Sequence, residues 1–549
     1  MQEKETREIK GASLKTWKKL LPFVKPYTRT IILLGLLMLG AAGIDVIIPI
    51  LSGYAVDAFI IPKTTDGIWA FAGGCMGLIL LQAFGTVGLA RLALKVEMYI
   101  GRDMKRALFN HLQTLSFDYY NATPVGTIMA RVMSDTNKIG SVLAWSLVDI
   151  IWSSASIVGY IAVMCSINFR LAMLIIAIVP FVAVLTYIFQ KKILKTNREV
   201  RRVNADITRS FNEGISGAKT SKTLVIEDQN AETFQGITQE MRKTSIRAIM
   251  LNAVYIPIVM FLSSLSVALI LTSGGNMVLG GIIGIGQLTI FINYALVIAD
   301  PVQQLARTLS NFIATQVNIE RCNYLLELKP QITDSPTVIE KYGTSFDPIR
   351  KNWEPIKGHI TFDDVSFMYS DGTENVLEHF NLDIPAGTTV AIVGETGAGK
   401  STLVNLACRF FEPTAGRVLI DGEDYKNRSL LWLHSNIGYV LQTPHLFSGS
   451  VMENIRYGRL DATDEEVMDA AKLVSAHHSI LRMEKGYQSD VGEGGDQLST
   501  GEKQLLSFAR AVLADPRIFV LDEATASIDT KTEELIQTAI SKLLGTRTS

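Results

Sequence analysis

The sequence GETGAGKS occupies residues 394–401 and follows an apolar segment at residues 388–393. It matches G-x-x-x-x-G-K-[ST], and its flanks predict a strand before the loop and a helix, Thr402 to Phe411, after it. Backbone N–H groups of such a loop surround phosphates, and the helix N-terminus adds positive potential. We expect Lys400 to reach the β- and γ-phosphates and Ser401 to bind Mg²⁺. The predicted phosphate site comprises Gly394, Glu395, Thr396, Gly397, Ala398, Gly399, Lys400, Ser401 and Thr402.

A second segment, Arg517-Ile-Phe-Val-Leu-Asp522-Glu523, predicts a buried strand that ends in two carboxylates. Strands of open α/β sheets deliver ligand-binding groups at their carboxyl ends. We expect Asp522 to hold the Mg²⁺ shell and Glu523 to polarise the water that attacks the γ-phosphate. The alternative is an ordinary solvated strand end, which the phosphate loop upstream disfavours.

Composition divides the 549-residue chain into two chemically different halves. Hydrophobic residues make up 48% and charged residues 19%, with a mean hydropathy of +0.25, which argues against an ordinary soluble enzyme and against disorder. Residues 1–330 hold 32 Lys and Arg against 21 Asp and Glu, whereas residues 331–549 hold 20 against 32. The four cysteines are scattered without a CxxC pair, so neither a disulfide framework nor a zinc site is expected.

Apolar runs in the first half predict six membrane-spanning helices. One span needs about 20 apolar residues, so the 52-residue run 248–299 must hold two, and we place its turn at the glycine-rich segment 273–281. Buried helices of a large soluble core are the alternative, but they would show polar positions at helical spacing. The other runs are 31–56, 68–90, 150–169 and 171–190.

Positive charge predicts the orientation of these helices. Cations cluster in the two polar stretches 91–140 and 191–247, whereas the short connections after the odd-numbered spans carry almost none. Under the positive-inside rule both termini are therefore cytoplasmic. The polar stretches read as helices that continue out of the bilayer, closed by turns near 118–126 and 214–222. A short amphipathic helix from Leu14 to Val24 is expected to lie along the cytoplasmic interface.

Three acidic residues interrupt or border the spans: Asp45, Asp149 and Asp300. An ionisable group within a span normally faces a cavity or a partner, so Asp45 is a candidate for a transport path. A carboxylic acid bonded to a neighbouring helix is the equally plausible alternative for Asp45. Asp149 and Asp300 lie near span ends and are weaker candidates.

With these motifs and spans, the chain resembles an ABC exporter half-transporter, in which six spans are fused to an ATP-binding cassette. The resemblance implies an interfacial segment at 1–30, a membrane domain at 31–322, a linker at 323–358 and a P-loop NTPase cassette of α/β fold at 359–549. It also implies that 118–126 and 214–222 are coupling helices. The cofactors would be ATP and Mg²⁺.

Further motifs match the family residue by residue. Tyr369 resembles the aromatic residue that stacks on adenine, and Gln442 the glutamine that contacts Mg²⁺ and the attacking water. Leu498-Ser-Thr-Gly-Glu502 stands where the family has its LSGGQ signature, so Ser499 and Gly501 would contact ATP held by another subunit. Asp529 matches the loop that meets the opposite subunit. The resemblance makes Glu523, Gln442 and Lys400 the catalytic set.

Two departures from the family pattern matter. Thr500 replaces a glycine and Glu502 a glutamine, which would weaken the clamp on a γ-phosphate. The chain ends at Ser549, before the strand that would carry the switch histidine, so we expect the cassette to lack its C-terminal part. Because the phosphate loop is intact while the signature is degraded, a heterodimer with unequal ATP sites is favoured over a homodimer.

The leading functional hypothesis is ATP-driven export of amphipathic small molecules by alternating access, from a multi-pass position in the plasma membrane. A lipid or lipid-linked flippase of the same architecture is the alternative. A nucleotide-gated regulatory or channel-like protein is a third, against which Glu523 argues. The expected partners are a second half-transporter, the lipid bilayer and the transported substrate, and no nucleic acid.

Overall fold

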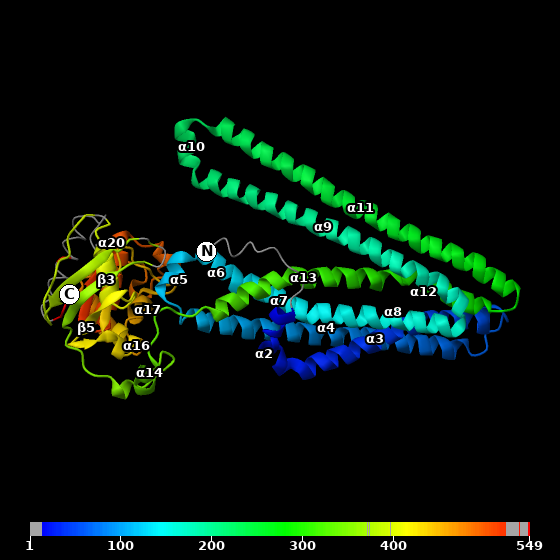
Figure 1. The fold of residues 1–549 in the computed structure, drawn as a ribbon, viewed down its shortest axis with the longest axis horizontal. Helices are drawn as coiled ribbons and strands as arrows, with labels where there is room; N and C mark the ends of the chain where they lie inside the picture. Colours follow the sequence, from blue (N-terminus) through cyan, green and yellow to red (C-terminus); the bar gives the residue numbers. More distant parts are fainter. Residues whose placement is uncertain (1–13, 370–371, 373, 396, 523–536, 538–546) are drawn as a thin grey trace. The chain divides into compact units, whose positions relative to one another are not determined.

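The chain forms two compact units in the computed structural model, which describes residues 14–369, 372, 374–395, 397–522, 537 and 547–549 (Figure 1). The first unit is the membrane unit, which runs to Gln113 and resumes over 123–328. The second is the cassette unit, which combines 114–122 with 329–549.

Among the described residues of the membrane unit, six helical segments are long and apolar enough to cross a membrane, which confirms the predicted number. Most continue well beyond the apolar runs, because the polar residues that follow keep the helical pattern. The helices are α1 (Leu14–Lys18), α2 (Leu21–Val24), α3 (Thr28–Ala55), α4 (Ile68–Leu112), α6 (Val125–Met129), α7 (Thr136–Ser141), α8 (Leu147–Ile167), α9 (Phe169–Ser216), α10 (Ala218–Leu224), α11 (Glu227–Leu279), α12 (Ile285–Val297) and α13 (Ala299–Glu327).

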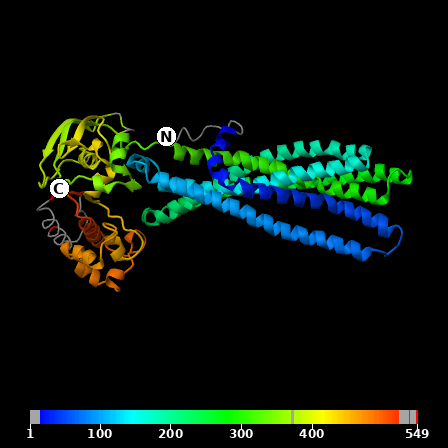
Figure 2. The same ribbon diagram turned by 90° about the horizontal axis from the view of Figure 1, so that it is seen from below.

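The longest helices, α9 and α11, lie side by side and are joined at one end by α10 (Figures 1 and 2). They contain 48 and 53 residues, which corresponds to about 72 and 80 Å at 1.5 Å per residue. A hydrocarbon layer of about 30 Å covers less than half of either helix.

The turn between the last two spans differs from our prediction of 273–281. Helix α11 continues through Leu279, and the chain turns over 280–284, where Gly281 has a φ of +70°. Gly274 stays helical because α12 packs closely against it: a Cβ there would lie 2.5 Å from Leu288 Cδ1. Part of the glycine-rich segment therefore serves helix packing rather than turning.

The predicted interfacial helix Leu14–Val24 is broken into α1 and α2. Pro22 occupies the first turn of α2, where its missing N–H is tolerated. Side chains of α1 and of the residue after it hold this segment on α13: the Trp17 ring lies 4.7 Å from that of Phe312, and Lys19 pairs with Glu327.

The cassette unit contains a four-stranded antiparallel sheet in the order β4-β3-β5-β6 and a parallel pair, β7-β8. Its strands are β1 (Gly343–Thr344), β2 (Asp347–Pro348), β3 (Ile360–Phe367), β4 (Leu377–Ile384), β5 (Ala415–Ile420), β6 (Glu423–Asp424), β7 (Ile437–Val440) and β8 (Ile518–Leu521). Its helices are α5 (Phe117–Ala122), α14 (Pro336–Tyr342), α15 (Lys400–Ala407), α16 (Leu430–Ser435), α17 (Val451–Arg456), α18 (Asp464–Leu473), α19 (His477–Leu481) and α20 (Thr500–Leu513).

Two hydrophobic cores organise this unit. One packs α15 against β3, β5 and β8 through Leu403, Leu406, Val418 and Ile518. The other packs α17, α18 and α20 together. The first core therefore contains both the helix that follows the phosphate loop and the first residue of β8, Ile518.

The strand predicted over 388–393 does not form. Among the described residues, its backbone pairs with the chain end: the Val390 N–H donates to the Ser549 carbonyl, and the Ser549 N–H donates to the Thr388 carbonyl. A strand requires a neighbour along its length, and this pairing stops at Val390. Ile392 and Val393 are consequently 39% and 88% exposed.

The segment expected to be a linker, 323–358, is largely ordered. Helix α13 includes its first five residues, and α14 and the β1–β2 hairpin follow. Trp432 Nε1 donates to the Glu354 carbonyl at 2.7 Å, which fastens the end of the segment to the cassette unit.

Candidate functional site

The phosphate loop leads directly into α15, as its sequence predicts. Gly397 and Gly399 have φ values of +89° and +85°, the left-handed region that favours glycine. A Cβ on Gly399 would also lie 3.2 Å from Val376 Cγ1. These glycines allow the loop to turn into the N-terminus of α15, whose first residue is Lys400.

The side chains at the loop are arranged around this helix start. Lys400 Nζ donates to the carbonyl oxygens of Gly394 and Glu395, both at 2.8 Å. Ser401 is exposed at the helix start. The buried Thr402 Oγ1 lies 2.9 Å from the Tyr369 hydroxyl, so the structure brings the predicted adenine-stacking residue to the loop. The Tyr369 ring packs edge-on against Phe367 and Phe411.

Gln442 and Asp522 meet at the carboxyl ends of the parallel pair. Val440 of β7 is in register with Leu521 of β8, and the Asp522 N–H donates to the Val440 carbonyl at 3.1 Å. Both predicted metal-site residues therefore leave the same sheet edge. Burial, and to a lesser extent the nearby Asp522 carboxylate, raise the pKa of Tyr439, which keeps this hydroxyl protonated.

The donor set at this edge suits Mg²⁺. The carboxylate of Asp522 and the amide oxygen of Gln442 are hard oxygen ligands, and the Ser401 hydroxyl at the start of α15 is a further donor of the same kind. Mg²⁺ is usually held by one or two protein groups together with substrate phosphates, which agrees with so sparse a set.

Three of the predicted site residues, Thr396, Glu523 and Asp529, lie outside the described residues. Their roles stay predictions from the sequence.

The signature segment forms a capping box at the start of α20. Ser499 is the N-cap, and Glu502 Oε2 accepts hydrogen bonds from the Ser499 N–H at 2.9 Å and from Ser499 Oγ at 2.7 Å. In return, Ser499 Oγ accepts from the Glu502 N–H. The Ser499 hydroxyl is thus engaged by an anion of its own helix. The S-x-x-E spacing of residues 499–502 is typical of a capping box, a signal that our sequence analysis missed.

An aromatic cluster holds α5 against the rest of the cassette unit. The Phe117 ring of α5 lies 4.6 Å from that of Phe410, which also packs against His434 and Tyr439 at 5.2 and 5.6 Å. Tyr439 is three residues before Gln442, so the cluster reaches the strand that carries the site. Phe410 is a residue that our sequence reasoning passed over, although it follows the phosphate-loop helix directly.

A groove opens beside the same strand on the cassette unit. Its lining includes Tyr439, Phe447, Tyr457 and Arg510. The Arg510 guanidinium lies over the Phe447 and Tyr457 rings at 5.6 and 5.9 Å. Its Nη1 and Nε donate to the carbonyls of His445 and Asn454, so the wall of the groove is held rigidly.

Two of the three acids that interrupt or border the spans, Asp45 and Asp149, accept hydrogen bonds from neutral side chains. Asp45 accepts from Gln82 Nε2 at 2.7 Å and from Trp152 Nε1 at 2.8 Å, which links α3 to α4 and α8. Asp149 accepts from Thr308 Oγ1 at 3.1 Å, and Asp300 is exposed. The geometry favours the bonded-acid interpretation of Asp45.

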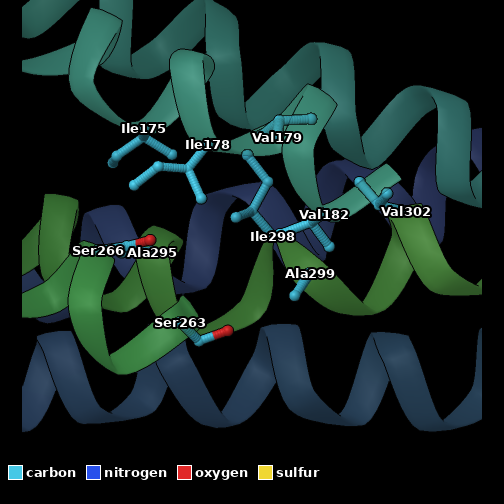
Figure 3. A pocket seen from close by; sticks show the side chains of 10 residues that line it. All are labelled: Ile175, Ile178, Val179, Val182, Ser263, Ser266, Ala295, Ile298, Ala299 and Val302. Carbon is cyan, nitrogen blue, oxygen red and sulfur yellow. The ribbon is translucent and has the colours of Figure 1, made fainter. Parts of the chain in front are cut away.

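A small cavity lies between α9, α11 and the α12–α13 junction. Figure 3 shows aliphatic side chains of α9, including Ile178 and Val182, facing Ile298 and Ala299. Ser263 and Ser266 of α11 are the polar residues of the lining.

Both halves of the chain match known protein families. The family profile described as ABC transporter transmembrane region matches residues 31–302, and the profile described as ABC transporter matches residues 377–526. The chain is 33% identical to the uncharacterized ABC transporter ATP-binding protein YknV of Bacillus subtilis, over 97% of this chain and 86% of that protein.

Two further relatives carry a functional name. A putative multidrug export ATP-binding/permease protein of Staphylococcus aureus is 32% identical, and one of Bacillus subtilis, YgaD, is 30% identical. Each match covers 97% of this chain and 91% of the relative. The six spans, the phosphate loop and the matches agree: the chain belongs to the ABC transporter family, as an ATP-hydrolysing exporter half-transporter that is integral to a membrane.

Proposed function

We propose that this chain exports amphipathic small molecules, with the cassette unit and both termini in the cytoplasm of a plasma-membrane protein. The substrate class rests on membership of the exporter family and on the names of relatives. The apolar cavity of Figure 3, at about 10 Å³, has room for no more than a water molecule and is not itself a substrate site. The names of two relatives, putative multidrug export proteins, support the same class.

In this proposal, the residues around α15 and the β7–β8 pair bind and hydrolyse ATP. Lys400 and the backbone N–H groups of the loop hold the phosphates, and Tyr369 stacks on the base. Ser401, Gln442 and Asp522 would hold Mg²⁺, which neutralises phosphate charge when bound. Glu523, next to Asp522 in the sequence, orients and activates the attacking water.

The exporter is a dimer, and we propose that the partner is a different chain. The capping box engages the Ser499 hydroxyl with the Glu502 carboxylate, which supports a signature that would clamp a γ-phosphate weakly. A partner with an intact signature would complete the ATP site built on Lys400 and Glu523. The signature of this chain would then cover a second, slower site.

We also propose that α10 of one subunit docks on the cassette of the other. The end of α10 exposes Leu224 and Val225, which are 62% and 81% accessible. The groove beside Tyr439 offers aromatic rings that such side chains could cover. Docking there would transmit a movement of β7, the strand that precedes Gln442, to α9 and α11.

The experiment is ATP-dependent dye transport in proteoliposomes. The chain is co-purified with candidate partners, and ethidium uptake is measured with wild-type protein and with Glu523→Gln as the matched control. ATP-dependent uptake that the variant loses supports the proposal. Turnover that lipids stimulate but that no amphipathic dye or drug stimulates would instead favour a flippase.

A further inference from the structure

The residue that follows the phosphate-loop helix is tied to the chain segment that leaves the last membrane helix. Helix α13 ends at Glu327, and Asp334 follows seven residues later, within the cassette unit. Arg409 lies two residues beyond the end of α15. Arg409 Nη1 donates to Asp334 Oδ1 at 3.1 Å.

This ion pair is buried. The Arg409 side chain is 1% exposed and that of Asp334 13%, whereas most ion pairs of the cassette unit are far more exposed. Arg409 is held from several further sides: it donates to Glu412 Oε1 at 2.9 Å and to the carbonyls of Tyr425 and Arg428. A guanidinium with so many fixed acceptors has no freedom to follow a moving partner.

Asp334 is fixed as firmly on its own side. Its carboxylate accepts the Leu430 N–H at 3.1 Å on both oxygens, at the start of α16. The carboxylate therefore joins the end of α15, the start of α16 and the segment from α13. Arg409 also pairs with Glu412 at 2.9 Å, so Asp334 is one of two carboxylates that neutralise it.

We infer that the Asp334–Arg409 pair is a tether that couples the end of α13 to the phosphate-loop helix. Helix α15 has only eight residues, so it moves as a rigid rod with Lys400 at one end and Arg409 just past the other. Only five residues lie between Leu328 and Asp334, so the connection spans at most about 22 Å when fully extended. A movement of α13 therefore moves α15. Closure of the ATP site moves α15 and, through the same pair, α13. Arg409 and Asp334 are thus positioning residues that act through α15.

The first test removes the charge and keeps the shape. Asp334→Asn preserves an acceptor for the Leu430 N–H, and Glu412 continues to neutralise Arg409. We expect ATP affinity and basal ATPase activity within about twofold of wild type, and at least about a fivefold loss of ethidium-stimulated ATPase activity. The matched control is Asp363→Asn, which breaks the exposed Asp363–Arg417 pair of the neighbouring sheet and should leave stimulation unchanged.

The second test keeps the pair and adds slack. Two glycines inserted after Gln331 leave every contact of Asp334 available but lengthen the connection to α13. If the pair is a tether, the insertion should lower ethidium-stimulated ATPase activity as strongly as Asp334→Asn does. If the pair is merely structural, the stimulated activity should stay at the wild-type level.

A readout without any substrate separates this inference from the proposed function. Spin labels at Lys63 and Ile282, both exposed at the ends of membrane helices, report movement of the membrane unit on addition of ATP and vanadate. We expect the movement in wild type and in Asp363→Asn, and its loss in Asp334→Asn and in the insertion. Full movement in both altered proteins, or a parallel fall of ATP affinity and melting temperature, would overturn the tether. Movement in wild type without ethidium stimulation would count against the proposed substrate only.

Discussion

Glu502 stands where the family resemblance predicts a glutamine. Its carboxylate caps α20 through Ser499, and in the proposed dimer it would face and repel a triphosphate held by the other subunit. Glu502→Gln keeps the capping box, since glutamine fills the same role, but removes the charge. We expect ATP affinity at the site covered by this signature to rise roughly three- to tenfold, the scale of one partly screened charge. Nucleotide titration of the assembled dimer measures this.

The control for that experiment is Ser499→Ala. It removes the cap, which should lower stability by about 1 kcal/mol without any gain in affinity. Unchanged affinity in Glu502→Gln would mean that the carboxylate does not face the nucleotide.

Tyr369 provides a second residue whose two functions can be separated. Its ring is proposed to stack on adenine, while its hydroxyl bonds to Thr402. Tyr369→Phe should leave ATP affinity nearly intact, whereas Tyr369→Ala should weaken it by ~1–3 kcal/mol. Calorimetry with ATP and with inorganic tripolyphosphate distinguishes the cases. An equal loss for tripolyphosphate would remove the ring from base recognition.

Asp45 shows how one side chain joins three helices. Its two oxygens accept from Gln82 of α4 and Trp152 of α8. Asp45→Ala leaves both donors without this acceptor, at about 1–3 kcal/mol each where they are buried. We expect a lower melting temperature in detergent, and an effect that is not additive with Trp152→Phe. Wild-type stability combined with altered substrate preference would instead assign Asp45 to the transport path.

Helix α10 carries the prediction on coupling between subunits. Leu224→Ser with Val225→Ser replaces its exposed apolar side chains and touches no buried core residue. We expect basal ATPase activity to persist and dye transport to fall at least about tenfold, as transport requires the docked helix. Lys222→Ser, on the same helix, is the control. Transport at the wild-type level in the double variant would exclude docking through these residues.

The elements show where sequence reasoning succeeds and where it stops. Helices that are long and strongly periodic, such as α4 and α9, were predictable because apolar length and charge act locally. The phosphate loop and β8 were predictable because short motifs carry their own geometry. The strand over 388–393 was not, because a strand depends on what lies beside it. The turn after α11 was misplaced because Gly274 packs against Leu288, a contact between residues of two different helices.

The sequence allowed most residues of the candidate site to be predicted, but not the contacts that join them to distant parts of the chain. Lys400, Gln442 and Asp522 follow from motifs, and the register of β7 with β8 brings the last two to one sheet edge. The Asp334–Arg409 and Phe117–Phe410 contacts join residues that are 75 and 293 positions apart. No local pattern encodes such pairs.

For the whole molecule, the decisive prediction is unequal ATP sites. A dimer of this chain with a different partner should bind two nucleotides but hydrolyse mainly one, and Glu523→Gln in this chain should abolish most turnover. Stoichiometry and ATPase activity are measured on the chain alone and after co-expression with each candidate partner. Full two-site activity from the chain alone would establish a homodimer.

The paired helices α9 and α11 have a mechanical consequence. About 40 Å of α9 extends past a hydrocarbon layer of about 30 Å, so the pair is a lever whose fulcrum lies at the membrane surface. A displacement of one helical turn at the far end needs a tilt of only about 8° at the fulcrum. Proline kinks absorb tilts of this size, and Pro180 and Pro257 lie within these two helices. The long arm thus converts a large travel at its α10 end into a small rotation among the packed side chains of the membrane-spanning part.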